Sequence, residues 1–393
     1  MSLDALTLAR LDTLIVDAPL PPDTWTTRRD DASWPAWPSP AANLDTLLAE
    51  AVAAAATGRV GVLLDGSAAS VLLGSHLRLA RPDAMAVTYC PRAEAGPDDA
   101  GAAAAWLGLT RRHARLDRSL VETWARFHEP AGHPDEPWAP APDLSVPSWA
   151  VAAQAAEVDT LFVPCGAAEL LGQWPRAPFP PARDAARRHY GYLPAQWSAW
   201  RARLALRAEL LAPEFVAVHG SAAASWPRAV LDPAIAAAMS EAEAQMRGEL
   251  AGRLLGATAP LLATAARLSG VAFVAPFVDP TVQATALAQH RGAAAAMERL
   301  LRDHVPPDLL RRARRRPVIE PHWLLAATLP EPLRAAFEPA AVAAEGFFDP
   351  VTLAAWRQCV AAAPEGPLNV ARARLLILAA GLRLRFGGIT LSG

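Results

Sequence analysis

Short apolar runs that alternate with helical patterns constrain the fold of this chain more than any other feature of its sequence. Three runs have the length and the apolar content of strands: Arg59–Leu64, Ala84–Tyr89 and Val158–Pro164. An edge strand is also predicted near Arg112–Leu116. Helical spacing of apolar residues predicts helices over 43–57, Val71–Ala80 and Pro97–Leu107. Because strands that alternate with helices pair in parallel, we expect an α/β fold with a doubly wound parallel sheet.

Loops of small residues follow two of the predicted strands. Asp65–Ser70 follows the first strand, and Cys165–Glu169 follows Val158–Pro164. A tight loop between a buried strand and a helix presents backbone N–H groups and the positive end of the helix to an anion. In doubly wound sheets, ligands bind at the carboxyl ends of the strands, where both loops are expected. These loops are candidates for a phosphate site, but by themselves they are a weak signal, because short loops of this kind after strands are common without a ligand.

The chain divides into three segments by composition. Residues 1–40 are rich in proline and contain Trp34 and Trp37, which predicts an extended strap packed on the main body. Residues 41–180 carry the predicted sheet, and residues 181–393 are expected to be mainly helical. In this third segment helices are predicted over Arg201–Leu211, Ala234–Leu255, Val282–Arg291 and Val370–Leu384.

All 37 basic residues are arginine, because the chain contains no lysine. Mechanisms that need a lysine, such as Schiff-base formation or the phosphate clamp of a Walker-A loop, are therefore excluded. The formal net charge of -2 argues against a nucleic-acid partner. No apolar run is long enough to cross a membrane, and charged residues interrupt any secretory segment, so we expect a cytoplasmic protein without a membrane partner.

Cysteines and histidines show no recognised metal pattern. Cys90, Cys165 and Cys359 form no CxxC pair, so neither a disulfide framework nor a cysteine zinc site is indicated. Residues 128–136 gather several metal-capable side chains, but their spacing matches no zinc pattern, and we assign no metal ligand from the sequence. Cys165 is either a nucleophile or, in the interpretation that we favour, a small structural residue.

Two other features stay open at this stage. The basic run Arg311–Arg316 is a solvated helix end, a phosphate site or, least favoured, a contact for nucleic acid. Four tryptophans in the segment expected to be helical either pack in a core or form an aromatic wall for a peptide: Trp174, Trp197, Trp200 and Trp226.

Six segments, in order along the chain, resemble the synthetase domain of the asparagine synthetase family, which is of the PP-loop type. Gly61–Ser70 resembles the pyrophosphate loop of that family, usually G-V-x-L-S-G-G-x-D-S. The other segments are Pro97–Asp99 with the following helix and His113, Asp135–Pro137, Leu161–Trp174, Val274–Asp279, and Arg312–Pro321 with Trp323. Within that family, the sequence of Val274–Asp279 resembles the lasso-peptide cyclases and β-lactam synthetases more than asparagine synthetase itself.

The resemblance implies a protein that binds Mg-ATP, adenylates a carboxylate and lets an amine displace AMP to form an amide. It assigns the nucleotide to Leu63, Asp65, Gly66, Ser67, Ser70 and Gly166. Arg315 stands where the family has a pyrophosphate-binding lysine, whereas Cys165 and Glu169 fall in the segment that serves the amine step. Since the chain begins Met1-Ser2, we expect no glutaminase domain with an N-terminal cysteine.

Departures from the family pattern lead to our hypotheses about function. The two metal-binding aspartates fall on Ala69 and Ala168, and an alanine methyl cannot bind Mg²⁺. The leading hypothesis is a pseudoenzyme that acts as a binding or scaffolding subunit, beside an active paralogue or a precursor peptide. One alternative is an active AMP-forming amide ligase in which Asp65 or Asp98 replaces the lost ligands; another is a nucleotide-binding regulator. Whether ATP and Mg²⁺ are cofactors stays open.

Overall fold

The computed structural model of this 393-residue chain describes residues 43–90, 98–116, 118–128, 144–170, 209–214, 258–289, 292–312, 331–363 and 367–386. Two predictions, the strap over 1–40 and the helix Ala234–Leu255, lie outside these residues. Of the helix predicted over Arg201–Leu211, the structure describes only the end, and there Leu211 pairs with Phe348 in an isolated antiparallel bridge.

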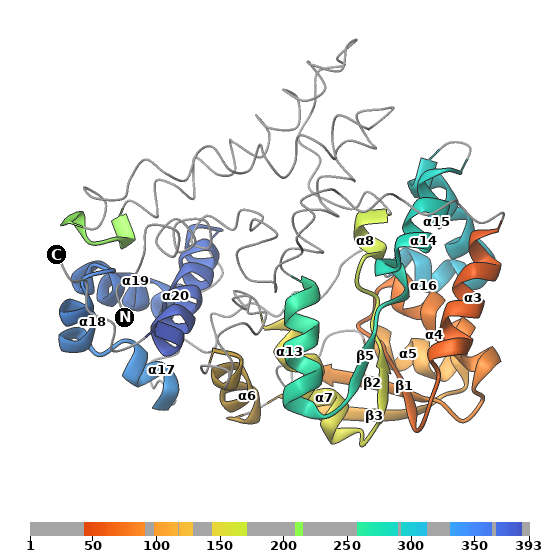
Figure 1. Cartoon of the computed structure of the whole chain (residues 1–393), viewed down its shortest axis with the longest axis horizontal. Helices are drawn as coiled ribbons and strands as arrows, with labels where there is room; N and C mark the ends of the chain where they lie inside the picture. The colour runs from red at the N-terminus through yellow and green to blue at the C-terminus, as the bar shows by residue number, and fades with distance from the viewer. Residues whose placement is uncertain are drawn as a thin grey trace, which may run out of the picture.

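A five-stranded parallel sheet forms the centre of the described chain, as Figure 1 shows. Its strands are β1 (Val60–Leu63), β2 (Met85–Cys90), β3 (Thr110–Arg115), β4 (Thr160–Phe162) and β5 (Ala272–Val274). They lie in the order β3-β2-β1-β4-β5, and every neighbouring pair is parallel. The predicted α/β fold with a parallel sheet is therefore confirmed, including β3 at an edge.

The fifth strand was not predicted, because the chain beyond 180 was expected to be mainly helical. β5 is only three residues long, too short to show a period of two in the sequence. It becomes a strand by pairing with β4, where Leu161 is opposite Phe273 and Phe162 is opposite Val274. Apart from this strand, the described chain after β4 is mainly helical.

Helices cover both faces of the sheet (Figure 1). On one face lie α3 (Leu44–Ala55), α4 (Ala68–Ala80), α5 (Asp99–Leu107), α14 (Pro280–Leu287), α15 (Gly292–His304) and α16 (Pro307–Arg312). On the other lie α6 (Arg118–His128), α7 (Ser145–Ala155) and α13 (Ala259–Ser269). Beyond α6 the chain forms a group of helices, α17 (Glu331–Ala336), α18 (Pro339–Glu345), α19 (Pro350–Ala362) and α20 (Pro367–Phe386). Two short elements, α8 (Ala167–Leu170) and the 3-10 helix η3 (Pro276–Val278), follow β4 and β5.

Polar side chains fix where the first helices begin. Asn43 caps α3 as predicted, since its side chain accepts hydrogen bonds from the N–H groups of Asp45 and Thr46 at 2.9 and 3.4 Å. Ser67 caps α4, which therefore begins three residues before the predicted start at Val71. Residues 68–70, between the observed start and the predicted one, are two alanines and a serine. Small residues of this kind are typical of loops as well as of the first turns of helices.

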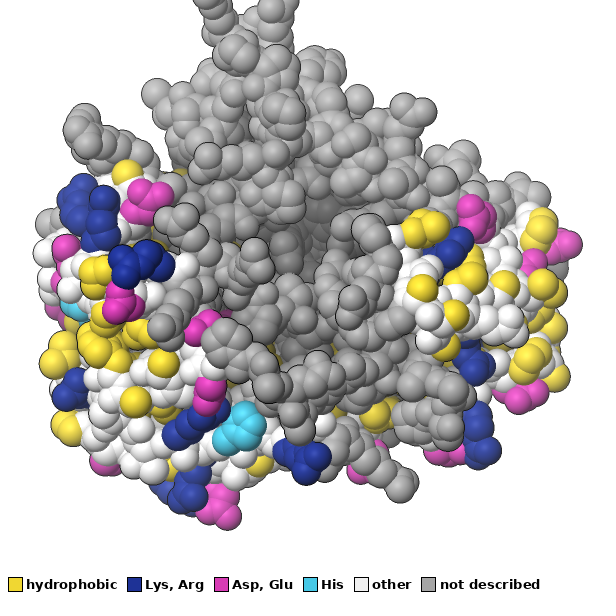
Figure 2. Space-filling view, turned by 180° about the vertical axis from the view of Figure 1, so that it is seen from behind, with side chains coloured by type: hydrophobic (Ala, Val, Ile, Leu, Met, Phe, Trp, Pro, Cys, Tyr) yellow, Lys and Arg dark blue, Asp and Glu magenta, His cyan; other side chains and the backbone are white. Residues whose placement is uncertain are grey.

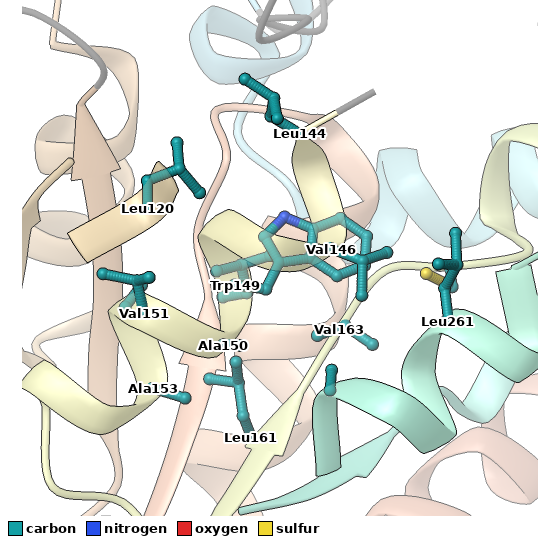
Figure 3. Close-up of a cluster of buried hydrophobic side chains, with 14 of the residues drawn as sticks. Leu120, Leu144, Val146, Trp149, Ala150, Val151, Ala153, Leu161, Val163 and Leu261 are labelled. Atoms are coloured by element: carbon teal, nitrogen blue, oxygen red, sulfur yellow. The ribbon is translucent and has the colours of Figure 1, made fainter. Parts of the chain in front are cut away.

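The core on the second face of the sheet surrounds α7 (Figure 3). Every residue from Val146 to Ala153 in this helix is buried, because α7 lies between the sheet and the helices α6 and α13. Trp149 is the largest of these side chains, and its indole N–H donates a hydrogen bond to Tyr89 Oη at 3.3 Å. This contact ties α7 to β2.

The described surface carries charges of both signs. In the space-filling view of Figure 2, arginines and acidic side chains alternate over the described residues. Within these residues, no helix has both the length and the apolar character needed to cross a membrane.

Candidate functional site

The topology of the sheet places a candidate site where β1 and β4 end. After β1 the chain adds β2 and then β3 on one side, and it returns to add β4 on the other side of β1. Connections that leave in opposite directions from neighbouring parallel strands open a crevice at their carboxyl ends, where α/β proteins bind ligands. The two loops of small residues, Asp65–Ser70 and Cys165–Glu169, both begin at this edge, and the second part of each is the first turn of a helix, α4 or α8.

Hydrogen bonds within the first loop close it on itself. Asp65 is buried, with 7% of its surface exposed, and its Oδ1 accepts the backbone N–H of Ser67 at 2.9 Å. The Ser67 Oγ accepts the N–H of Ser70 at 3.2 Å, and the Ser70 hydroxyl donates to the Ser67 carbonyl at 2.8 Å. Gly66 makes the turn with φ of +77°, a left-handed conformation that favours glycine.

The aspartate in this loop changes what the loop can bind. A loop of this shape attracts an anion because its N–H groups point into it at the end of a helix. Here the Ser67 N–H already has an anionic partner from the chain itself, and the Ser70 N–H is taken by the capping hydroxyl. The carboxylate of Asp65 therefore occupies the role that a phosphate oxygen would take.

The second loop packs directly against the segment that follows β5. Gly166 has φ of +88°, and a Cβ built there would lie 2.7 Å from the backbone oxygen of Phe277 in η3. The structure thus brings together Gly166 and Phe277 from two segments far apart in the sequence. Cys165, the preceding residue, is buried among the hydrophobic side chains of the core, an environment more typical of a structural cysteine than of a reactive thiol.

Asp98 is held by an arginine. It caps α5 by accepting the N–H of Gly101 at 2.8 Å, and it pairs with both terminal nitrogens of Arg111, one of them at 3.1 Å. Burial alone would raise the pKa of Asp98, but the hydrogen bonds from Arg111 and Gly101 and the nearby positive charge outweigh it and lower the pKa.

Asp99, by contrast, lies beside the first loop. A Cβ built on Gly66 would be 3.6 Å from the Cβ of Asp99. The Oδ1 atom of Asp99 is buried and has no hydrogen-bond partner among the described residues. Of the acidic pair, Asp99 is therefore the carboxylate available to a ligand at this edge.

The two alanines that the resemblance aligns with metal-binding aspartates lie in equivalent places. Ala69 is in the first turn of α4, directly after β1, and Ala168 is in α8, directly after β4. Since β1 and β4 are neighbours, both methyl groups belong to the same edge of the sheet. Ala69 is buried and Ala168 is half-buried. Neither side chain has an atom that can bind a cation.

Other predicted site residues are placed only in part. Leu63 is fully buried in β1, so its contribution to any ligand is through its backbone or the shape of the strand. Glu169 belongs to α8, and nothing is described of its side chain. Three predictions lie outside the described residues: Arg315, the segment Asp135–Pro137 and the tryptophans 174, 197, 200 and 226.

Comparison with known proteins gives no match. No family model matches the chain, and no curated protein sequence does. The resemblance to the asparagine synthetase family therefore depends on the motifs and on their order alone.

Sequence spacing did not reveal one further group of chemically capable side chains. Asp45, His76 and His304 lie together in the structure, with their ligand atoms within 4.8 Å of one another. We refer to these three residues as the histidine–aspartate cluster. They come from three separate helices, α3, α4 and α15, so no short motif in the sequence contains two of them.

Proposed function

We propose that this chain is an asparagine-synthetase-like pseudoenzyme that acts as a binding or scaffolding subunit in amide-bond or peptide-modifying biosynthesis. The observation that carries the proposal is the hydrogen bond between the Asp65 carboxylate and the Ser67 N–H inside the loop where the family binds pyrophosphate. The expected partner is an active paralogue or a precursor peptide.

Electrostatics explain why Asp65 disfavours a nucleotide. Two like charges about 4 Å apart repel by about 4 kcal/mol at an effective dielectric constant of about 20. A hydrogen bond to a charged group contributes only about 1.5–3 kcal/mol, so a single backbone contact to phosphate would not compensate. Because Asp65 is buried, water screens this repulsion poorly.

The residues at the metal positions do not fit Mg²⁺ either. Hard cations such as Mg²⁺ need oxygen ligands, and Ala69 and Ala168 offer none. A developing negative charge on pyrophosphate would thus lack the cation that normally stabilises it, and one lost stabilising contact costs about 2.7–4 kcal/mol of activation free energy. We therefore derive no adenylation step at this edge.

Calorimetry with Mg-ATP and a pyrophosphate-exchange assay test the proposal directly. The wild-type protein is expected to show no exchange, and the variant Asp65→Ser is expected to bind nucleotide more tightly than wild type because the like charge is removed. Asp83→Asn, in an exposed aspartate paired with Arg81, is the matched control and should change nothing. Exchange that persists after purification of wild-type protein to homogeneity would overturn the proposal.

A second candidate function, an active amide ligase, is favoured by one observation. Asp99 has a buried carboxylate oxygen without a hydrogen-bond partner among the described residues, next to Gly66. In this version Asp99, rather than the Arg111-bound Asp98, would supply a cation ligand. The same exchange assay separates the two candidates: activity in wild type that Asp99→Asn abolishes supports a ligase. Nucleotide binding that is insensitive to EDTA and without exchange would instead indicate a regulator.

A further inference from the structure

The histidine–aspartate cluster joins three helices at one point. Asp45 is in the first turn of α3, His76 is in the second half of α4, and His304 is the last residue of α15. Asp45 Oδ1 lies 3.3 Å from His76 Nε2 and 2.9 Å from His304 Nε2. The two imidazole rings lie side by side, with centroids 4.7 Å apart and planes inclined by 44°. α3, α4 and α15 lie next to one another in Figure 1.

The facing atoms do not satisfy one another by hydrogen bonding. Asp45 Oδ1 and His76 Nε2 are both buried, and neither has a hydrogen-bond partner of acceptable geometry among the described residues. Only 3% of the His76 side chain is exposed, so water cannot readily supply the missing partner. A buried polar atom left without a partner costs about 1–3 kcal/mol. Two such atoms, with His304 Nε2 only 2.9 Å from Asp45 Oδ1, therefore call for a ligand between them.

The distances fit a metal ion. Imidazole nitrogens and carboxylate oxygens bind Zn²⁺ at about 2.0–2.2 Å, so two ligands of a tetrahedral ion are about 3.4 Å apart. The distances of 2.9 and 3.3 Å from Asp45 Oδ1 to the two imidazole nitrogens are close to this value. All ligand atoms lie within 4.8 Å of one another, so a small movement of the rings would bring them to the spacing of a tetrahedral site. Two imidazoles also favour a transition metal over Mg²⁺ or Ca²⁺, which prefer oxygen ligands.

The protonation state of His76 agrees with this assignment. Burial lowers the pKa of His76, and the neighbouring His304 lowers it further, against an opposing effect of Asp45. A neutral imidazole is the form that binds metals.

We infer that Asp45, His76 and His304 bind one divalent transition-metal ion of the zinc class, which clamps α3, α4 and α15 together. Three protein ligands leave the fourth position to water. The cluster is accessible to it, since 41% of the Asp45 side chain and 22% of the His304 side chain are exposed. This inference does not depend on the proposed function, because none of the three residues belongs to the loops at the edge of the sheet. His76 is about 12 Å along α4 from Ala68 at 1.5 Å per residue.

Titration of the full-length protein with Zn²⁺ tests the inference. After treatment with EDTA and dialysis, the protein is titrated in a calorimeter and its thermal unfolding is followed at increasing Zn²⁺ concentrations. We expect one ion per chain and a Tm that rises with Zn²⁺, because a ligand that binds only the folded state stabilises it by mass action. Co²⁺ should give the visible absorption spectrum of a tetrahedral site.

Variants of the exposed ligands keep the test independent of folding. Asp45→Asn and His304→Gln replace partly exposed side chains, and we expect each to weaken Zn²⁺ binding about tenfold or more and to abolish the rise in Tm. His113→Gln is the matched control, because His113 is exposed on β3 and its Nδ1 contacts Thr88 Oγ1 at 2.9 Å. Wild type that binds no Zn²⁺, or variants that bind it as tightly as wild type, would overturn the inference. An equal loss of Zn²⁺ binding in His113→Gln would also overturn the inference.

Discussion

Single side chains decide what the carboxyl edge of the sheet can do. Asp65 turns a loop suited to phosphate into one that already holds an anion, through one hydrogen bond of 2.9 Å to Ser67. Ala69 and Ala168 offer no cation ligand at this edge, and a methyl group packs easily at the start of a helix. At this scale the backbone is that of a parallel α/β sheet, and these three side chains set which chemical groups its carboxyl edge offers.

Asp98 gives a prediction at the residue scale. Its pKa lies below the ordinary value of 3.8, so its stabilising effect is present above pH 3.8 and is lost as the pH falls through the lowered folded value. With 55% of the side chain exposed, the ion pair with Arg111 contributes at most about 1 kcal/mol. At pH 7, Asp98→Asn should therefore unfold at a lower urea concentration than wild type.

The pH dependence provides the control for this prediction. In acid, below the folded pKa of Asp98, the two proteins should have the same stability, because wild type has then also lost the charge. The free energy of unfolding of Asp98→Ala should be lower than that of Asp98→Asn by about 1 kcal/mol, since the alanine also removes the cap of α5. A difference between wild type and Asp98→Asn that persists in acid would contradict the assignment.

At the scale of elements, a buried ion pair holds the C-terminal helices together. Arg383 of α20 and Glu345 of α18 are each 8% exposed, and the guanidinium meets both carboxylate oxygens at 2.6 and 2.9 Å. Arg383 also donates to the carbonyl oxygen of Ala336 at the end of α17. One side chain thus joins three helices, which makes the group of helices sensitive to its loss.

Replacing Arg383 should destabilise the protein strongly. Arg383→Met leaves the Glu345 carboxylate buried without its partner, and we expect a loss of about 3–5 kcal/mol in the free energy of unfolding. Arg334→Met is the matched control, because Arg334 pairs with Glu331 on an exposed helix face and should cost about 0–1 kcal/mol. Urea denaturation measures both. Equal losses in the two variants would show that the buried pair has no special role.

At the scale of the whole molecule, distant segments meet through close backbone approaches. β5 completes the sheet from beyond residue 270, and η3 after it packs against Gly166 after β4. The histidine–aspartate cluster likewise joins α3 and α4 to α15 from much later in the chain. The early α/β segment and these later segments therefore depend on each other for their arrangement.

Two glycines with positive φ make it possible to measure the cost of backbone strain apart from the cost of this packing. Gly166→Ala and Gly270→Ala both place an L side chain at positive φ, which costs about 1–2 kcal/mol. A Cβ at Gly270 meets nothing within 4 Å, whereas one at Gly166 meets Phe277 O at 2.7 Å. Gly166→Ala should thus be the more destabilising in thermal or urea unfolding, by about a further 1–3 kcal/mol. Equal losses of stability in the two variants would show that η3 can move away from the added Cβ without a cost in free energy.

The sequence by itself determined the elements that depend on local pattern. Apolar runs predicted β1, β2 and β4, and β3 was predicted as an edge strand. Asn43 predicted the start of α3, and the two small-residue loops were predicted at the carboxyl ends of strands, because hydrophobic period, capping and turn chemistry act over a few residues. Only the tertiary structure decided the rest. β5 is a strand through its pairing with β4, Asp99 rather than Asp98 is the available carboxylate, and Asp45, His76 and His304 converge. These depend on which distant segments pack together, and no pattern of neighbouring residues records such contacts.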